Sequence, residues 1–318
     1  MIALVLAAAI AASPTQAVSP TTPAPVAQTS TEESPVRLED IIVSGRPLDS
    51  LISSFVGEVA APNPHRGIAR WENGLCIGAA NLRPEAAQYL VDRVSTVASD
   101  LGLRPGAPGC APNVMIIATT DAKGTAERLV QHNRRDLRMG GAGMDRGGTA
   151  LQAFQTSDRP VRWWQVSIPV DSETGLPATR IPGECNPPCE KAGDYAPNIP
   201  IFAASRLSTQ IVDKLFRTII ILDVDQVSRV TPDQLADYVS MVTFAQINPE
   251  ADTGRYASIL NLFEDPGSAP GLTQWDRAYL EGLYDAERTR QNRRAGRTEI
   301  AASIRRAHED LRNEEAQP

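Results

Sequence analysis

The chain has 318 residues, of which 42% are hydrophobic, 22% charged and 5% aromatic. This balance is typical of a globular protein with one large or two small domains, and it excludes a collagen-like or wholly disordered chain. The formal net charge of -7 argues against a protein that binds nucleic acid through a basic surface, so no nucleic-acid partner is predicted.

The N-terminal segment predicts export. Residues 2–12 form an apolar run about half as long as a membrane-spanning helix, and small residues follow it. This pattern is typical of a cleaved signal peptide, here over residues 1–17. Residues 18–36 are rich in Pro, Thr and Ala and predict a disordered linker. Because no other apolar run is long enough to cross a bilayer, we expect a soluble periplasmic protein that is not embedded in the membrane.

The four cysteines fit an oxidising compartment. Three pairings are possible. We favour Cys76–Cys110 and Cys185–Cys189, because the second pair lies close together in a proline-rich loop. The alternative is a zinc site of four thiolates, which usually needs two close pairs rather than one.

The supply of histidine also argues against zinc. A catalytic zinc needs about three protein ligands, chiefly histidines. His65 lies in a proline-flanked loop, His132 on the polar face of a predicted helix and His308 in the tail. Carboxylates alone favour harder ions such as calcium or magnesium. No metal and no other cofactor is therefore predicted.

Apolar periodicity and turn residues predict the first elements of the chain. A short strand at residues 39–44 precedes a helix at 48–59. A strand–helix–strand unit follows, with strands at 75–82 and 114–118 and a helix that begins at Pro84. A parallel strand pair with a right-handed crossover is the expected arrangement of this unit.

The second half of the chain predicts both strands and helices. A helix at 123–137 leads into a glycine-rich loop at 140–148. A strand at 161–170 contains Pro169, which indicates an edge strand or a strand end. The remaining elements are a long loop closed by the second cysteine pair at 171–198, a helix at 206–216, a strand at 218–224, a helix that starts at Thr231 and Pro232, a helix at 273–285, and a weakly amphipathic helix near the C-terminus.

These elements together predict one α+β (or α/β) domain over residues 37–285. We expect a mixed sheet that includes the strand–helix–strand unit, with helices packed on it. The Arg-rich tail, residues 286–318, is expected to attach loosely.

Two aspartates at the end of a strand are the candidate catalytic residues. Residues 219–227 read Ile-Ile-Ile-Leu-Asp-Val-Asp-Gln-Val, which resembles the first motif of haloacid-dehalogenase-like phosphotransferases. The resemblance implies Asp223 as nucleophile and Asp225 as acid/base at a magnesium site, and hence a hydrolase. The chain departs from that family downstream, where Asp233 and Asp237 follow but no lysine does. The alternative is a strand end whose aspartates cap the following turn.

Four residues are candidates for ligand binding. Trp163 and Trp164 adjoin in a strand, so their side chains point to opposite faces, one into the core and the other available as a stacking platform for a sugar or a peptide. Asp145 and Arg146 lie in the glycine-rich loop, which lacks Gly-x-Gly-x-x-Gly and follows a helix rather than a strand. The alternative for that loop is a plain connection between two helices.

Residues 39–46 read Glu-Asp-Ile-Ile-Val-Ser-Gly-Arg. This segment resembles the short box of TonB-dependent outer-membrane receptors. The resemblance implies that it pairs as a strand with a periplasmic protein partner. An ordinary first strand of the domain is the alternative.

The C-terminal third combines the strand at 218–224, a helix at 235–247, the turn Ser258-Ile-Leu-Asn261 and a closing helix at 272–284. This order resembles secreted zincin-like bacterial metallopeptidases and implies a zincin-like C-terminal half. The zinc-binding His-Glu-x-x-His is missing from the helix, so no catalytic residue carries over.

As a whole, the chain resembles a family of periplasmic proteins from alphaproteobacteria such as sphingomonads. That resemblance implies no particular activity. We expect a non-catalytic binding or interaction protein on a metal-free zincin-like scaffold, with a small ligand or a periplasmic protein as its partner. The alternative is the carboxylate hydrolase at Asp223 and Asp225.

Overall fold

The computed structural model describes residues 47–72, 74–139, 143–185, 187–200 and 206–316. The chain divides into two units, residues 1–37 and 38–318, and every described residue belongs to the second unit. The predicted signal peptide, the linker, the first strand and the TonB-like box lie outside the described residues.

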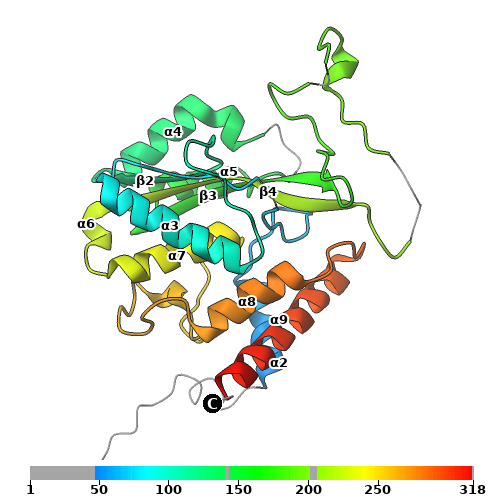
Figure 1. Cartoon of the computed structure of the whole chain (residues 1–318). Coiled ribbons are helices and arrows are strands. Elements are labelled where there is room, and N and C mark those ends of the chain that lie inside the picture. Colours follow the sequence, from blue (N-terminus) through cyan, green and yellow to red (C-terminus); the bar gives the residue numbers. More distant parts are fainter. Residues whose placement is uncertain (1–46, 73, 140–142, 186, 201–205, 317–318) are drawn as a thin grey trace, which may run out of the picture. The chain divides into compact units, whose positions relative to one another are not determined.

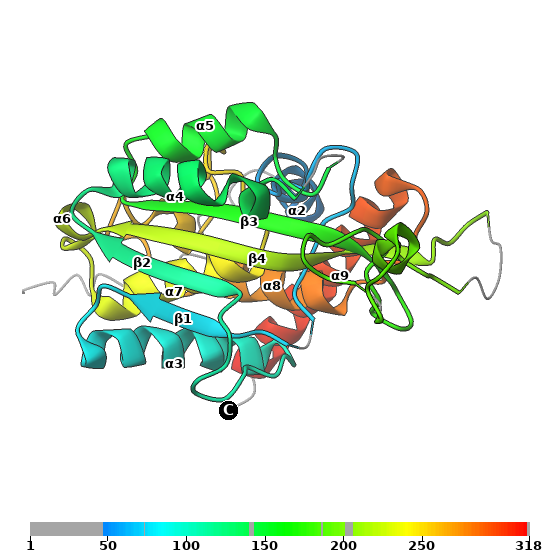
Figure 2. The ribbon, with the colours of Figure 1, turned by 90° about the horizontal axis from the view of Figure 1, so that it is seen from above.

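A mixed four-stranded sheet is the framework of the fold, as the sequence predicted. Figure 2 shows the strands side by side in the order β1 (Ile77–Ala80), β2 (Val114–Thr119), β4 (Ile211–Asp223) and β3 (Val161–Asp171). The first three run parallel to one another, and β3 pairs antiparallel with β4 as an edge strand. The edge position explains how Pro169, which has no N–H to donate, fits into β3.

The predicted strand–helix–strand unit is confirmed. Helix α3 (Pro84–Asp100) connects β1 to the parallel strand β2. Pro84 stands in its first turn, where the missing N–H costs no hydrogen bond. Strand β1 is shorter than predicted, because Leu75 forms only an isolated bridge with Pro105.

Helices cover both faces of the sheet because apolar side chains alternate along β4. Ile220 belongs to one buried cluster, while Ile219 and Ile221 belong to the other. Figure 1 shows α4 on one side of the sheet and α3 and α7 on the other. The first cluster contains side chains of α2 (Leu48–Glu58), α3, α7 (Pro232–Phe244) and α8 (Gln274–Asp285), and the second contains side chains of α4 (Ala122–Leu137) and α5 (Gly148–Thr156).

Capping residues set where the helices of the C-terminal third begin. Thr231 caps α7 and Thr273 caps α8, each in a reciprocal capping box with the residue three positions on. Both starts were predicted from the sequence. The predicted tight turn at residues 258–261 is also present, as the short helix η2 (Ile259–Asn261).

The prediction of a helix at residues 206–216 is wrong. Strand β4 already begins at Ile211 and pairs with β3 over eleven of its residues, from Ile211 opposite Asp171 to Leu222 opposite Val161. Val212 and Leu215, which would share one face of a helix, are buried in the clusters on opposite faces of the sheet. Opposite faces are what strand alternation gives for two residues three positions apart, and the one register shift of this pair, between Val166 and Ser167, leaves Phe216 of β4 without a partner in the register. At its other end β4 stops at Asp223, and the short helix α6 (Val224–Val227) follows.

The tail forms a long helix, α9 (Arg293–Glu315). In contrast to the loose attachment that we expected, α9 packs along α8 and α2, as Figure 1 shows. Ile304 is only 2% exposed and belongs to the larger core cluster. The Ser303 hydroxyl donates to the Asp285 carboxylate at 2.8 Å, which ties the helix to the end of α8.

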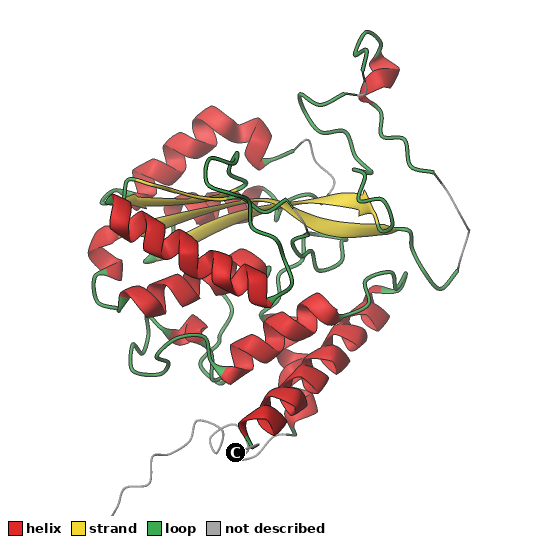
Figure 3. Cartoon of the chain, viewed as in Figure 1, coloured by secondary structure: helices red, strands yellow, loops and turns green. Residues whose placement is uncertain are grey.

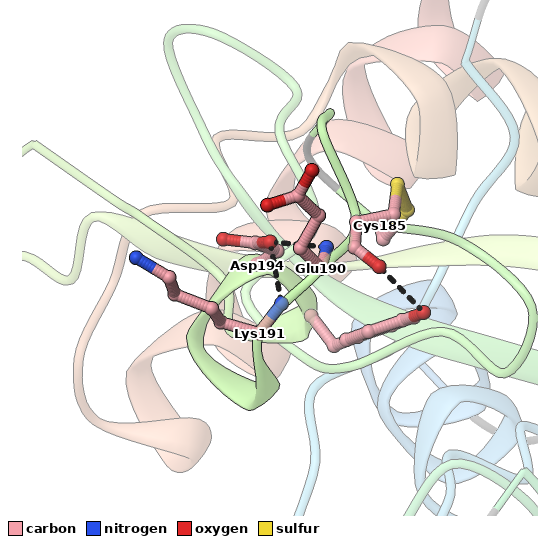
Figure 4. The surroundings of a disulfide bond; sticks show 6 residues. Cys185, Glu190, Lys191 and Asp194 are labelled. Carbon is pink, nitrogen blue, oxygen red and sulfur yellow. Dashed lines mark hydrogen bonds between the residues drawn. A yellow bond between two sulfur atoms is a disulfide. The ribbon is translucent and has the colours of Figure 1, made fainter.

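Two disulfides join the cysteines as the sequence favoured, Cys76 to Cys110 and Cys185 to Cys189. The second closes a tight turn in the long segment between β3 and β4, which Figure 3 shows as a loop reaching beyond the end of the sheet. Next to it, the Asp194 carboxylate accepts hydrogen bonds from the backbone N–H groups of Glu190 and Lys191, at 2.7 and 2.9 Å (Figure 4). The carboxylate therefore holds the start of the short helix η1 (Ala192–Tyr195).

Candidate functional site

The most promising site lies where the parallel strands end. In open sheets with parallel strands, ligands commonly bind outside the carboxyl ends of the strands. Here β4 ends at Asp223 and the antiparallel β3 begins at Val161, opposite Leu222, so both termini meet at one end of the sheet. A cavity of about 450 Å³ lies beside this end, between the segment that enters β3, α6 and the segment 247–264.

A second cavity of about 260 Å³ adjoins the first. The two share four lining residues: Ser157, Arg159, Trp163 and Pro249. We call the pair of cavities the β3 cleft. The smaller cavity is further lined by α5, Arg146, Arg162 and Glu250. Its lining contains three arginines against one acidic residue, which favours an anionic ligand.

The structure places three of the four predicted binding residues at the β3 cleft: Arg146, Trp163 and Trp164. The two indoles point to opposite faces of the sheet, as expected, but both are buried, with exposed fractions of 7% and 3%. The Trp163 Nε1 donates to the Ile247 carbonyl at 3.2 Å, and the Trp164 Nε1 donates to the Leu137 carbonyl at 2.9 Å. Both tryptophans are therefore core residues, and little ring surface is left for stacking on a ligand.

Asp145, the fourth predicted binding residue, does not line either cavity of the β3 cleft. Its buried carboxylate accepts from the Arg138 Nε at 3.0 Å and from the Gly147 N–H at 2.7 Å. These bonds fix the chain just before α5, so the glycine-rich segment connects two helices, as the alternative interpretation expected. The neighbouring Arg146 donates to the Asn248 Oδ1 at 2.8 Å. Burial lowers the pKa of Arg146, and the charge of Glu250 opposes that shift.

Arg162 is the most unusual residue of the β3 cleft. It stands in the most apolar part of β3, is only 5% exposed, and donates from Nη1 to the Gln155 carbonyl at 3.2 Å. Within the described part of the chain, its Nε has no hydrogen-bond partner. Burial lowers the pKa of Arg162, while the carboxylates of Asp158 and Asp223 raise it. A buried charged donor without a partner is costly unless a ligand satisfies it.

Arg162 is not one of the candidates predicted from the sequence, although it directly precedes the tryptophan pair. The available signal was a charged residue inside a strand that is otherwise apolar. Such a residue is buried only when tertiary contacts accommodate it.

The candidate catalytic aspartates lie outside the lining of the β3 cleft. Asp223 caps α6 by accepting from the Gln226 N–H at 3.2 Å, which matches the capping alternative, and Asp225 is exposed. Asp233 accepts from the Tyr89 hydroxyl, and Asp237 forms an ion pair with Arg93 at 2.6 Å. None of these four carboxylates lines either cavity of the β3 cleft.

Among the residues that the structure describes, no group of three or more His, Cys, Asp or Glu side chains is arranged to hold a metal ion. None of the described helices is both long enough and apolar enough to cross a bilayer. Comparison with family models, curated proteins and solved structures gave no match to this chain.

Proposed function

We propose that this protein is an exported, non-catalytic binding protein that holds a small anionic ligand in the β3 cleft. The observation that carries the proposal is the buried guanidinium of Arg162, whose Nε lacks a hydrogen-bond partner among the described residues. Guanidinium groups bind carboxylates and phosphates through charge-assisted hydrogen bonds. Arg146 and Arg159 line the same cavity and add positive charge.

The size of the β3 cleft supports a small molecule rather than a protein segment. Ligand pockets commonly enclose about 300–1,000 Å³, and the larger cavity alone encloses about 450 Å³. Trp163 and Tyr238 line this cavity, and their rings meet edge to face at 6.3 Å between centroids. Two rigid aromatic side chains thus support the cavity.

Two other observations support the wider proposal. The paired disulfides are typical of proteins that fold in an oxidising compartment such as the periplasm. The order β4, α7, η2 and α8 follows the order of elements on which the resemblance to zincins rests. A metal-free zincin-like scaffold therefore stays part of the proposal.

The test is a binding measurement on the purified exported protein. Calorimetry with phosphate, sulfate, acetate and succinate should find at least one anion that binds the native protein. Arg162→Gln should weaken that binding about tenfold or more, because a hydrogen bond to a charged group contributes roughly 1.5–3 kcal/mol. Arg135→Gln, at an exposed position on α4, is the matched control and should bind as the native protein does.

Because replacing the buried Arg162 can disturb folding, a second variant is made at a less buried position. Arg159→Gln, at a partly exposed position between the two cavities, should also weaken binding. The proposal is overturned if none of the four anions binds, or if both variants bind as tightly as the control.

A further inference from the structure

A third cavity, of about 440 Å³, shares no residue with the β3 cleft. It lies between the loop 62–68, the start of β4, the segment that follows α8 and the first two turns of α9. We call it the α9 cavity. Its lining is strongly cationic: two acidic residues, Asp213 and Glu287, stand against six arginines, namely Arg66, Arg70, Arg288, Arg290, Arg293 and Arg297.

Internal contacts occupy several of these arginines. Arg70 donates from Nη1 to the carbonyls of Leu283, Tyr284 and Ala286 at the end of α8. Arg288 forms an ion pair with Glu72 at 2.7 Å. The remaining ion pairs are longer, with Arg290 lying 3.6 Å from Glu299 and Arg66 lying 3.8 Å from Asp213.

Arg293 and Arg297 differ from the other arginines of the α9 cavity in their contacts. Both line the cavity from α9, four residues apart, and neither forms an ion pair within the described part of the chain. Like charges at this spacing on a helix repel each other. The positive charges of the cavity also act on Arg70. Its burial and then the charge of Arg288 lower the pKa of Arg70 to about 10. An anion in the α9 cavity would relieve this repulsion.

Two residues that line the α9 cavity each have a buried oxygen without a hydrogen-bond donor among the described residues. Asn63 is 2% exposed, and its amide donates to the Ser167 hydroxyl at 2.8 Å, but its Oδ1 has no hydrogen-bond partner among the described residues. The Asp213 Oδ2 accepts from the Gly67 N–H at 2.8 Å, whereas its Oδ1 lies 3.8 Å from the Arg66 Nη1 and accepts no hydrogen bond from the residues that the structure describes. Buried acceptors of this kind are normally satisfied. Hydroxyl groups of a ligand would satisfy both.

We propose that the α9 cavity binds a small hydroxylated oxyanion, either a sugar acid or a polyol phosphate. Arg293 and Arg297 bind the anionic group, and the Oδ1 atoms of Asn63 and Asp213 accept hydrogen bonds from its hydroxyls. The α9 cavity is a second site, and its ligand is independent of whatever occupies the β3 cleft.

The experiment measures binding of two hydroxylated anions and their fragments to the purified Arg159→Gln protein, in which binding of acetate or phosphate at the β3 cleft is weakened. Glucuronate is compared with acetate and with glucose, and glycerophosphate with inorganic phosphate and with glycerol. At least one hydroxylated anion should bind about tenfold or more tightly than either of its fragments, since it uses both the arginines and the acceptors. Equal binding of the fragment anion would overturn the role of Asn63 and Asp213.

Substitutions at the arginines test whether the hydroxylated anion binds in the α9 cavity. Arg293→Gln/Arg297→Gln, at two exposed positions, should weaken binding of the hydroxylated anion about tenfold or more. Arg294→Gln/Arg312→Gln removes the same charge from the same helix at positions outside the cavity, and it should bind as the native protein does. Arg162→Gln should also leave this binding unchanged. The proposal is overturned if both double variants weaken binding equally, if neither does, or if only Arg162→Gln does.

Discussion

At the scale of single residues, Asp276 joins two segments of the C-terminal third. Its side chain is wholly buried and accepts from the Ser258 hydroxyl at 2.6 Å, the Ile259 N–H at 2.8 Å and the Thr273 N–H at 3.0 Å. The first two donors belong to the turn at 258–261, and the third precedes α8. One carboxylate therefore fixes the turn against the start of the helix.

We expect Asp276→Asn to lower the free energy of unfolding by about 1–3 kcal/mol, because an amide NH2 group would face donors that need an acceptor. Urea unfolding at neutral pH measures this loss. Asp310→Asn, at an exposed position on α9, is the control and should change stability by less than about 0.5 kcal/mol. Equal stability of the two variants would contradict the bridging role of Asp276.

The carboxyl group of Asp276 should also make the stability of the protein depend on pH. Burial raises the pKa of Asp276, although its hydrogen bonds lower it. The native carboxyl then binds a proton more tightly than the unfolded chain does, so its contribution to stability is greatest below the ordinary pKa of aspartate and declines as pH rises through the raised value. The stability advantage of the native protein over Asp276→Asn should therefore be larger near pH 4 than near pH 7. An advantage that grows with pH would contradict the raised pKa.

At the scale of elements, the contact between α8 and α9 depends on one glycine. A Cβ atom at Gly282 would lie 2.4 Å from both the backbone nitrogen and the Cα of Ile304. Because that neighbour is helix backbone rather than a flexible side chain, it can move away only if α9 shifts. Gly282 thus lets the two helices approach closely enough to bury Ile304.

Gly282→Ala should therefore destabilise the protein by about 1–3 kcal/mol through overpacking. The matched control is Gly57→Ala in α2, where a Cβ meets nothing within 4 Å. That control should be neutral or gain up to about 1 kcal/mol, because alanine restricts the unfolded chain and suits a helix. Thermal unfolding of both variants measures the two changes in stability. If Gly282→Ala leaves the stability unchanged, this contact does not hold α9 in place.

At the scale of the whole molecule, the two disulfides constrain very different lengths of chain. Cys76 and Cys110 are 34 residues apart, and their bond links the segments that enter the parallel strands β1 and β2 on either side of α3. Cys185 and Cys189 are 4 residues apart within one loop. A longer closed loop removes more conformational entropy from the unfolded chain.

Replacing Cys76 and Cys110 by alanine should cost about 4 kcal/mol of unfolding free energy, and replacing Cys185 and Cys189 about 2 kcal/mol. Chemical unfolding of the two double variants gives both values. Mass spectrometry of the native protein should show the loss of four protons relative to the free thiols. Four free thiols, or the reverse order of the two stability losses, would contradict this account.

Local signals allowed the sequence to predict much of the fold. Pro84, Thr231 and Thr273 act on N–H groups within their own helix turns, so the starts of α3, α7 and α8 could be predicted without knowing what they pack against. The same holds for the parallel pairing of β1 with β2, because a helix between two strands returns the chain to the end of the sheet where the first strand began. The close spacing of Cys185 and Cys189 likewise indicated their pairing.

Tertiary structure decided the features that depend on residues far apart in the chain. Residues 211–216 fit a helical period as well as a strand, and only pairing with β3 made them a strand. The close packing of α9 needed a glycine at 282 to face Ile304. The same is true of the candidate sites: folding alone brings Arg146, Arg162 and Glu250 to the lining of one cavity, and Asn63 and Arg297 to the lining of another. The charges and the apolar periodicity of a sequence indicate contacts within a few helical turns. A binding cavity depends instead on the distances between segments that are far apart in the sequence, and only tertiary packing sets those distances.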